Sequence, residues 1–237
     1  MHYFVSDIHL GAGTRAEQRR AEGLFLNFLS QIEADAESLF LVGDIFDFWF
    51  EYKRVVPKGF VRVLGRLAEL SDKGVRVVML TGNHDMWVGD YLTEECGIEL
   101  YTTPQIFTLE GKKFYISHGD NTNIKGEPML RLMNSFFRSK SLRVVASWLI
   151  HPDHFLKFGQ WWSGSSRKAH KDQTDLKYLD PLIEFAKGYN DQTIDHFVFG
   201  HIHIPHQTEN ITFLGNWAHA ASWAELDKSG NITLKTK

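Results

Sequence analysis

The chain has 237 residues, of which 43% are hydrophobic and 23% are charged, and its formal net charge is −3. This composition excludes a disordered or fibrous protein and leaves enough chain for a substantial core. The single cysteine, Cys96, excludes an intrachain disulfide and a cysteine-rich zinc site. No apolar run reaches the ~18 residues of a membrane-spanning helix, and no signal peptide is recognisable, so we expect a cytoplasmic protein.

The first part of the chain alternates between predicted strands and predicted helices. Short apolar runs at 2–6, 38–42 and 75–80 indicate buried strands. Between them, apolar residues recur with a helical period within 24–32 and within 60–70. The second of these helices follows Pro57 and ends before Gly74. This alternation predicts an α/β fold with a largely parallel sheet and right-handed crossovers.

The rest of the chain departs from this alternation. Runs at 113–117 and 196–199 predict two further buried strands, and runs at 211–214, 218–226 and 232–234 predict an antiparallel end to the sheet or a second sheet. At about 122–172 the pattern becomes helical, which we interpret as an insertion into a single domain that spans residues 1–237.

The composition of this insertion is unusual. From residue 125 to residue 171 there are nine Lys and Arg residues against two acidic ones, a net charge of +7, together with seven Phe and Trp residues. We expect most of the aromatic side chains to pack the helices onto the body and the others to line an acyl groove. The cations either face solvent or bind anionic groups, such as lipid headgroups at a membrane surface. The rest of the chain carries −10, which argues against extended contact with nucleic acid.

The chain is unusually rich in histidine, with 12 residues. Five short polar segments that contain His or Asp each follow a predicted strand. The segments are Asp7-Ile8-His9, Gly43-Asp44-Ile45-Phe46-Asp47, Gly82-Asn83-His84-Asp85, His118-Gly119-Asp120 and Gly200-His201-Ile202-His203. Because the carboxyl ends of the strands of an α/β sheet converge on one edge, we expect these segments to meet there. Each segment alone is compatible with an ordinary turn. Together their oxygen and imidazole donors predict a site for Mn, Fe or Zn.

This ordered set of motifs resembles the calcineurin-like metallophosphoesterase superfamily, and the resemblance covers nearly the whole chain. It implies a four-layer αββα sandwich with a helical insertion and a site for two divalent metal ions. One ion would be bound by Asp7, His9, Asp44 and His203, and the other by Asp44, Asn83, His118 and His201. The resemblance also implies that His84 stabilises or protonates the reacting phosphate, and that Asp85 orients His84 through a hydrogen bond.

Within the superfamily, the chain looks most like the UDP-2,3-diacylglucosamine diphosphatases of lipid A synthesis. This resemblance rests on residues 4–11, on residues 43–49 and on the helical insertion after residue 120. It implies hydrolysis of the pyrophosphate of a nucleotide-linked glycolipid to lipid X and UMP. It also implies Mn²⁺ as the metal, with Fe or Zn as alternatives, and peripheral attachment to the inner face of the inner membrane. Trp49, Arg167, Lys168 and Lys171 are the candidate substrate contacts.

One position departs from this pattern, because the best-known diphosphatases have Arg where this chain has His84. A histidine can transfer a proton, which an arginine cannot. The alternatives are a phosphoesterase for another phosphodiester or a dinucleotide, a nuclease of the same superfamily, and a metal-free scaffold. A metal-free scaffold would have lost some of the metal ligands, whereas here every candidate position carries one. We therefore rank the scaffold last.

Overall fold

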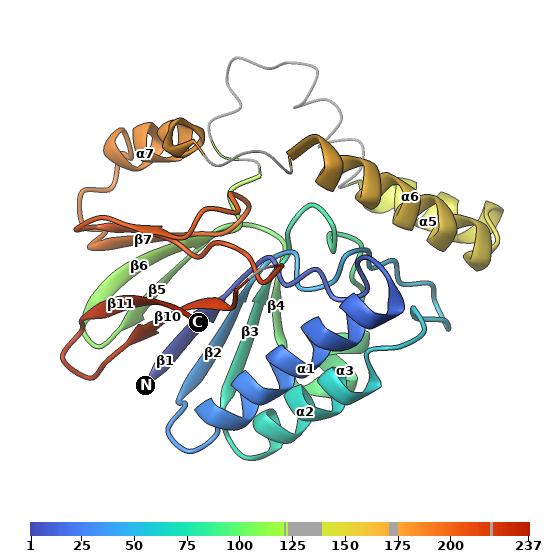
Figure 1. Ribbon diagram of the computed structural model, residues 1–237, viewed down its shortest axis with the longest axis horizontal. Helices are drawn as coiled ribbons and strands as arrows, with labels where there is room; N and C mark the ends of the chain where they lie inside the picture. Colours follow the sequence, from blue (N-terminus) through green and yellow to red (C-terminus); the bar gives the residue numbers. More distant parts are fainter. Residues whose placement is uncertain (121, 123–138, 171–174, 219) are drawn as a thin grey trace.

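Two β-sheets pack face to face, and helices cover the outer face of each (Figure 1). The computed structural model describes residues 1–120, 122, 139–170, 175–218 and 220–237. The first sheet has the order β11 (Ile232–Thr236), β10 (Ser222–Leu226), β1 (His2–Val5), β2 (Ser38–Val42), β3 (Arg76–Leu80) and β4 (Glu99–Tyr101). The second has the order β5 (Gln105–Leu109), β6 (Lys112–Ser117), β7 (His196–Phe199), β9 (Ile211–Phe213) and β8 (His206–Gln207).

The helices complete the outer layers. The first sheet is covered by α1 (Arg15–Ile32), α2 (Val61–Asp72) and α3 (Tyr91–Cys96) (Figure 1). The second is covered by the short 3₁₀ helix Leu176–Leu179 and by α7 (Asp180–Lys187). Two further helices, α5 (Lys140–Leu149) and α6 (Pro152–His170), lie to one side of this sandwich (Figure 1). Among the helices that the structure describes, none has both the length and the apolar character needed to cross a bilayer.

The alternation of side chains along each strand explains the layers. In β2, Leu39 and Leu41 face the helices, whereas Phe40 and Val42 face the space between the sheets. Successive residues of a strand point to opposite faces, so a continuous apolar run fills two cores at once. The same holds for β6, where Phe114 and Ile116 lie between the sheets while its neighbour Tyr115 packs on the helical side. The predicted α/β sandwich of four layers is therefore confirmed.

The parallel strands bring the predicted motifs to one edge. Strands β1 to β4 are mutually parallel, and β6, β7 and β9 form a parallel group in the other sheet. The antiparallel strands are β10 and β11 in the first sheet and β5 and β8 in the second. All five polar segments follow strands of the parallel groups.

Several boundaries differ from the predictions. Helix α1 begins nine residues before the apolar pattern, because Thr14 and Glu17 form a capping box. Helix α2 begins at Val61, after an uncapped Phe60, and not at Pro57. Strand β10 begins at Ser222, later than the predicted run from 218. The short elements α3, β4, β5 and β8 were not predicted.

Helix α6 packs on the loop that follows β2. The ring of Phe155 lies 4.3 Å from that of Phe50, measured between centroids. A Cβ atom at Gly159 would come within 2.3 Å of the Phe48 ring, so only glycine allows this close approach. Just before α6, the Tyr52 hydroxyl donates a hydrogen bond to the Ile150 carbonyl oxygen, at 3.2 Å. These contacts hold α6 against the loop that follows β2.

Candidate metal centre

The backbone turns sharply where the strands end. Asp7, His9, Asp44 and His201 all have positive φ, between 49° and 64°. Asp and His are among the residues that tolerate this left-handed conformation, although at some energetic cost. The turn is held by backbone hydrogen bonds from Asp7 to Gly43 (3.1 Å) and from His9 to Asp44 (3.0 Å). As a result, Asp7 and His9 project towards the same point.

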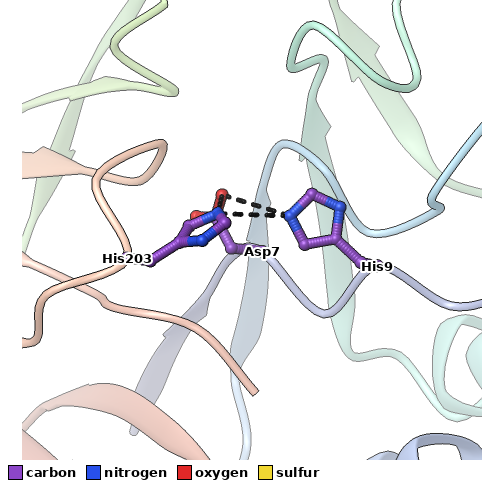
Figure 2. Close-up of side chains that lie close together, drawn as sticks. All are labelled: Asp7, His9 and His203. Atoms are coloured by element: carbon purple, nitrogen blue, oxygen red, sulfur yellow. Dashed lines mark hydrogen bonds and ion pairs between the residues drawn. The ribbon is translucent and has the colours of Figure 1, made fainter. Parts of the chain in front are cut away.

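Asp7, His9 and His203 form the first group of candidate ligands (Figure 2). Nε2 of His203 lies 3.3 Å from Oδ1 of Asp7 and 3.3 Å from Nε2 of His9. Within the described part of the chain, the buried Oδ1 of Asp7 has no hydrogen-bond partner. Buried polar atoms are normally paired, so an unpaired carboxylate oxygen between two imidazole nitrogens fits a divalent cation.

His118 and Asn83 form a second group, which Asp44 completes. Nε2 of His118 lies 3.3 Å from Oδ2 of Asp44 and 3.3 Å from Oδ1 of Asn83. The other ring nitrogen, Nδ1, donates a hydrogen bond to the Val42 carbonyl oxygen at 2.9 Å. Nε2 therefore faces two oxygen atoms, an arrangement that either a ring proton or a bound cation in its place stabilises. The ring of His201 stacks edge-on against that of His118, with 5.2 Å between centroids.

Asp44 stands between the two groups. Its carboxylate lies close to both Asp7 and His118, and it also belongs to a cluster with His9 and His84. A Cβ atom at Gly82 would come within 2.1 Å of Oδ1 of Asp44, so this position requires glycine. Oδ2 of Asp44 faces His118, while Oδ1 accepts a hydrogen bond from the His84 backbone N–H at 2.8 Å. A carboxylate shared by both groups of candidate ligands is suited to bridge two metal ions.

The electrostatics of the site differ among its histidines. Burial lowers the pKa of His9 to about 3 and that of His201 to about 4, which keeps both rings neutral with a free lone pair. Burial raises the pKa of Asp44, but the neighbouring histidines, His118 first, outweigh this effect and hold it well below its usual value. Burial also opposes the charged form of His118, yet the Asp44 carboxylate raises its pKa well above the ordinary value.

His84 lies at the edge of this cluster. Its Nδ1 donates a hydrogen bond to the Asp47 carbonyl oxygen at 2.8 Å, and its Nε2 lies 3.8 Å from Oδ2 of Asp44. The predicted orientation of His84 by the Asp85 carboxylate is not what the structure contains. Asp85 turns away and accepts hydrogen bonds from the backbone N–H groups of Ile45 and Gly82, both at 2.8 Å. It thus joins the two loops that carry Asp44 and Asn83.

The structure places the four candidate substrate contacts in different surroundings. Trp49 has no exposed surface and packs against Phe46 and Phe60 in the core, so its side chain is not available to a substrate. Arg167 and Lys168 belong to the last turns of α6, and Lys171 lies outside the described residues.

Two residues near His84 were not predicted to contact it. The carbonyl oxygen of Asp47 accepts its ring proton, and the hydroxyl of Ser163 on α6 lies 3.0 Å from the same ring nitrogen. A serine within a helical pattern carries no signal in the sequence that would have revealed this contact.

A small pocket begins at the candidate metal centre. One side is formed by Asn83, His84 and the neighbouring loop, and the opposite side by Phe158, Trp162 and Ser163 of α6. The pocket has a volume of about 30 Å³, close to that of one water molecule, so it marks where the polar loop meets the apolar side of α6.

The comparisons of this chain with a family model and with curated proteins agree with each other. The family model described as calcineurin-like phosphoesterase matches residues 3–205. The chain is 33% identical to the UDP-2,3-diacylglucosamine hydrolase of Porphyromonas gingivalis, with 95% of this chain and 93% of the relative aligned. It is 29% identical to the protein of that name from Histophilus somni strain 129Pt, over 96% of this chain and 97% of the relative. It is 27% identical to the UDP-2,3-diacylglucosamine hydrolase of Haemophilus influenzae strain KW20, with 97% of this chain and 96% of the relative aligned.

Proposed function

Because this chain belongs to the calcineurin-like phosphoesterase family, we propose that it is a metal-dependent hydrolase that cleaves the pyrophosphate bond of UDP-2,3-diacylglucosamine. The products are lipid X and UMP. The observation that carries this proposal is the junction of two parts: the candidate metal ligands, which reach to His84, and the apolar side chains of Phe158 and Trp162 on α6. A nucleotide-linked glycolipid has the same two parts, a diphosphate and apolar acyl chains. The names of the relatives aligned over nearly their full length support the same substrate.

The candidate ligands divide between two divalent metal ions. Asp7, His9, Asp44 and His203 would hold one, and Asp44, Asn83, His118 and His201 the other. Two such ions activate a water molecule as nucleophile and polarise a phosphoryl oxygen. The donors are carboxylate, amide and imidazole without thiolate, a set that suits Mn²⁺, with Fe and Zn as the alternatives.

His84 is the candidate acid–base group. Since its Nδ1–H is donated to the Asp47 carbonyl oxygen, its Nε2 is the atom that holds or moves a proton. Nε2 faces the metal ligands, where the phosphate would bind. Once Nε2 has also taken up a proton, the imidazolium can protonate the leaving oxygen or stabilise the charge that develops on the phosphoryl group; the neutral ring, with its lone pair on Nε2, can accept that proton.

The insertion at about 122–172 supplies the lipid-facing part of the protein. In α5 the side chains of Trp148 and Leu149 are 85% and 78% exposed, and Trp161 in α6 is 65% exposed. Tryptophan is favoured at membrane–water interfaces, and the positive charge of the segment attracts anionic headgroups. Peripheral attachment at the inner face of the inner membrane would bring the pocket to a substrate that resides in lipid.

A substrate comparison tests this function. The protein supplied with Mn²⁺ is assayed on UDP-2,3-diacylglucosamine, on UDP-N-acetylglucosamine as the control without acyl chains, on a dinucleotide and on a nitrophenyl phosphodiester. We expect kcat/KM for the lipid nucleotide to exceed the others by about a thousandfold, because binding of the acyl chains contributes to catalysis. Equal or faster hydrolysis of the dinucleotide would instead assign a soluble substrate.

A further inference from the structure

Ser163 of α6 reaches the candidate catalytic histidine. Its side chain is fully buried, and its hydroxyl donates a hydrogen bond to Oδ1 of Asp47 at 2.5 Å. The same hydroxyl oxygen lies 3.0 Å from Nδ1 of His84. A serine hydroxyl has a single proton but two lone pairs. With the proton directed at the carboxylate, the oxygen can only accept from the histidine ring.

These contacts determine the tautomer of His84. Its Nδ1–H is shared between the Asp47 carbonyl oxygen, at 2.8 Å, and the Ser163 hydroxyl oxygen. Both partners are acceptors, so the neutral ring carries its proton on Nδ1. The lone pair is thereby placed on Nε2, which faces Asp44 at 3.8 Å. The hydrogen bond at one ring nitrogen thus sets the chemistry of the other.

The position of Ser163 depends on the docking of α6. Phe155, Gly159 and Ser163 are spaced by four residues and lie on one face of this helix. Phe155 packs on Phe50, and Gly159 lies directly against the Phe48 ring. This row of contacts brings the hydroxyl to the loop after β2.

We propose that Ser163 is a positioning residue that holds His84 in the Nδ1–H tautomer, so that the insertion completes the catalytic centre as well as covering it. The inference rests on the proposed role of His84 in phosphoester hydrolysis. It adds that acid–base competence depends on the docking of α6, which links the lipid-facing part of the protein to the chemistry.

The tautomer itself gives a test that is independent of the substrate. Nitrogen NMR of the protein with labelled histidine, loaded with diamagnetic Zn²⁺, reports which ring nitrogen of His84 carries the proton. We expect the Nδ1–H form in the unaltered protein, and a mixture with the Nε2–H form in Ser163→Ala. An Nε2–H ring in the unaltered protein would overturn the proposal, as would an unchanged Nδ1–H ring in folded Ser163→Ala, because the Asp47 carbonyl oxygen would then be sufficient on its own.

Kinetics with the lipid nucleotide provide the second test. Ser163→Ala is expected to lower kcat about tenfold, in the range found for residues that orient a functional group, with KM changed less than about twofold. Ser163→Thr keeps the hydroxyl and should restore most of kcat. Ser147→Ala on α5, which removes a hydroxyl bonded only to a local carbonyl oxygen among the described contacts, is the matched control and should be unaffected.

A double-mutant cycle separates positioning from general structural damage. If Ser163 acts through His84, Ser163→Ala has no further effect on kcat in a His84→Ala background. A full tenfold loss in that background would show that Ser163 acts elsewhere. If the unaltered protein does not hydrolyse the lipid nucleotide, the proposed function fails, whereas the NMR result still decides the tautomer.

Discussion

Nε2 of His118, at the end of β6, lies 3.3 Å from Oδ2 of Asp44, which follows β2 in the other sheet. The two sheets are therefore joined at this edge by a carboxylate and an imidazole, while the opposite nitrogen of the ring is bonded to the Val42 carbonyl oxygen. The contact shows how a sandwich of two sheets places donors from distant parts of the sequence around a single carboxylate.

Loss of the shared carboxylate should affect both candidate metal sites. We expect Asp44→Ala to reduce bound Mn²⁺ well below two ions per chain and to lower kcat by at least about a thousandfold, because each ion loses a charged ligand. Metal content is measured by mass spectrometry, and the rate of hydrolysis is measured with UDP-2,3-diacylglucosamine as substrate. The exposed Asp153→Asn on α6 serves as the control. Two fully retained ions with normal turnover in Asp44→Ala would contradict the assignment.

Replacement of His84 should separate catalysis from metal binding. We expect His84→Ala to retain nearly all bound metal but to lose about a hundredfold or more in kcat, as is usual when an acid–base group is removed. The measurement combines metal content with kcat and KM on the lipid nucleotide. A variant with unchanged turnover would remove His84 from the mechanism.

The exposed tryptophans of the insertion should contribute to membrane binding. We expect the double variant Trp148→Ser, Trp161→Ser to bind vesicles containing phosphatidylglycerol at least about tenfold more weakly, since both indoles are favoured at the interface. Val61→Ser on α2, which removes an apolar side chain that is 76% exposed on another face, is the matched control. Co-sedimentation gives the bound fraction, and equal binding by all three proteins would place the contact elsewhere.

A buried histidine far from the candidate metal centre should make stability depend on pH. Burial, with a smaller effect of the Lys112 charge, lowers the pKa of His196 to about 4, and its Nε2 is hydrogen-bonded to the Thr212 hydroxyl at 2.8 Å. Between this value and the unfolded value of about 6.5, the unfolded chain binds more protons. The contribution of His196 is therefore fully present above about pH 6.5 and is lost as the pH falls towards 4.

His196→Gln tests this dependence while keeping a polar partner for Thr212. We expect the difference in the free energy of unfolding between pH 7.5 and pH 5 to shrink by about 1–2 kcal/mol in the variant. Urea denaturation at pH 7.5 and pH 5 measures the free energy of unfolding of both proteins. Because both proteins share every candidate metal ligand, titration of those ligands cancels in the comparison. An identical difference in the two proteins would rule out His196 as the source.

The parallel strands and the candidate ligands were accessible from the sequence because each strand is a short apolar run that ends in a polar motif. Phe40 and Val42 pack between the sheets immediately before Asp44, so the pattern that defines the strand also locates the ligand. The start of α1 was missed because residues 15–23 are polar. The available signal was the capping box of Thr14 and Glu17. Strands such as β4, with three residues, are too short to give a pattern.

The direction of side chains in the loops could not be predicted in the same way. Asp85 is adjacent to His84 in sequence, but the turn directs its carboxylate to the backbone of Ile45 and Gly82. Trp49 follows a candidate ligand loop, yet its indole lies in the core. Ser163 meets His84 only through the packing of α6, a contact across 79 residues. Spacing along the chain indicates which motifs converge, whereas these orientations depend on tertiary packing.

The left-handed backbone at Asp7, His9, Asp44 and His201 has a consequence for the life of the protein in the cell. Each such residue destabilises the fold by about 1 kcal/mol or more, a penalty that binding of metal to the same side chains can offset. A newly made chain that finds no metal would open at this edge more often and be cleaved sooner by proteases. The amount of the protein would then follow the supply of the ion.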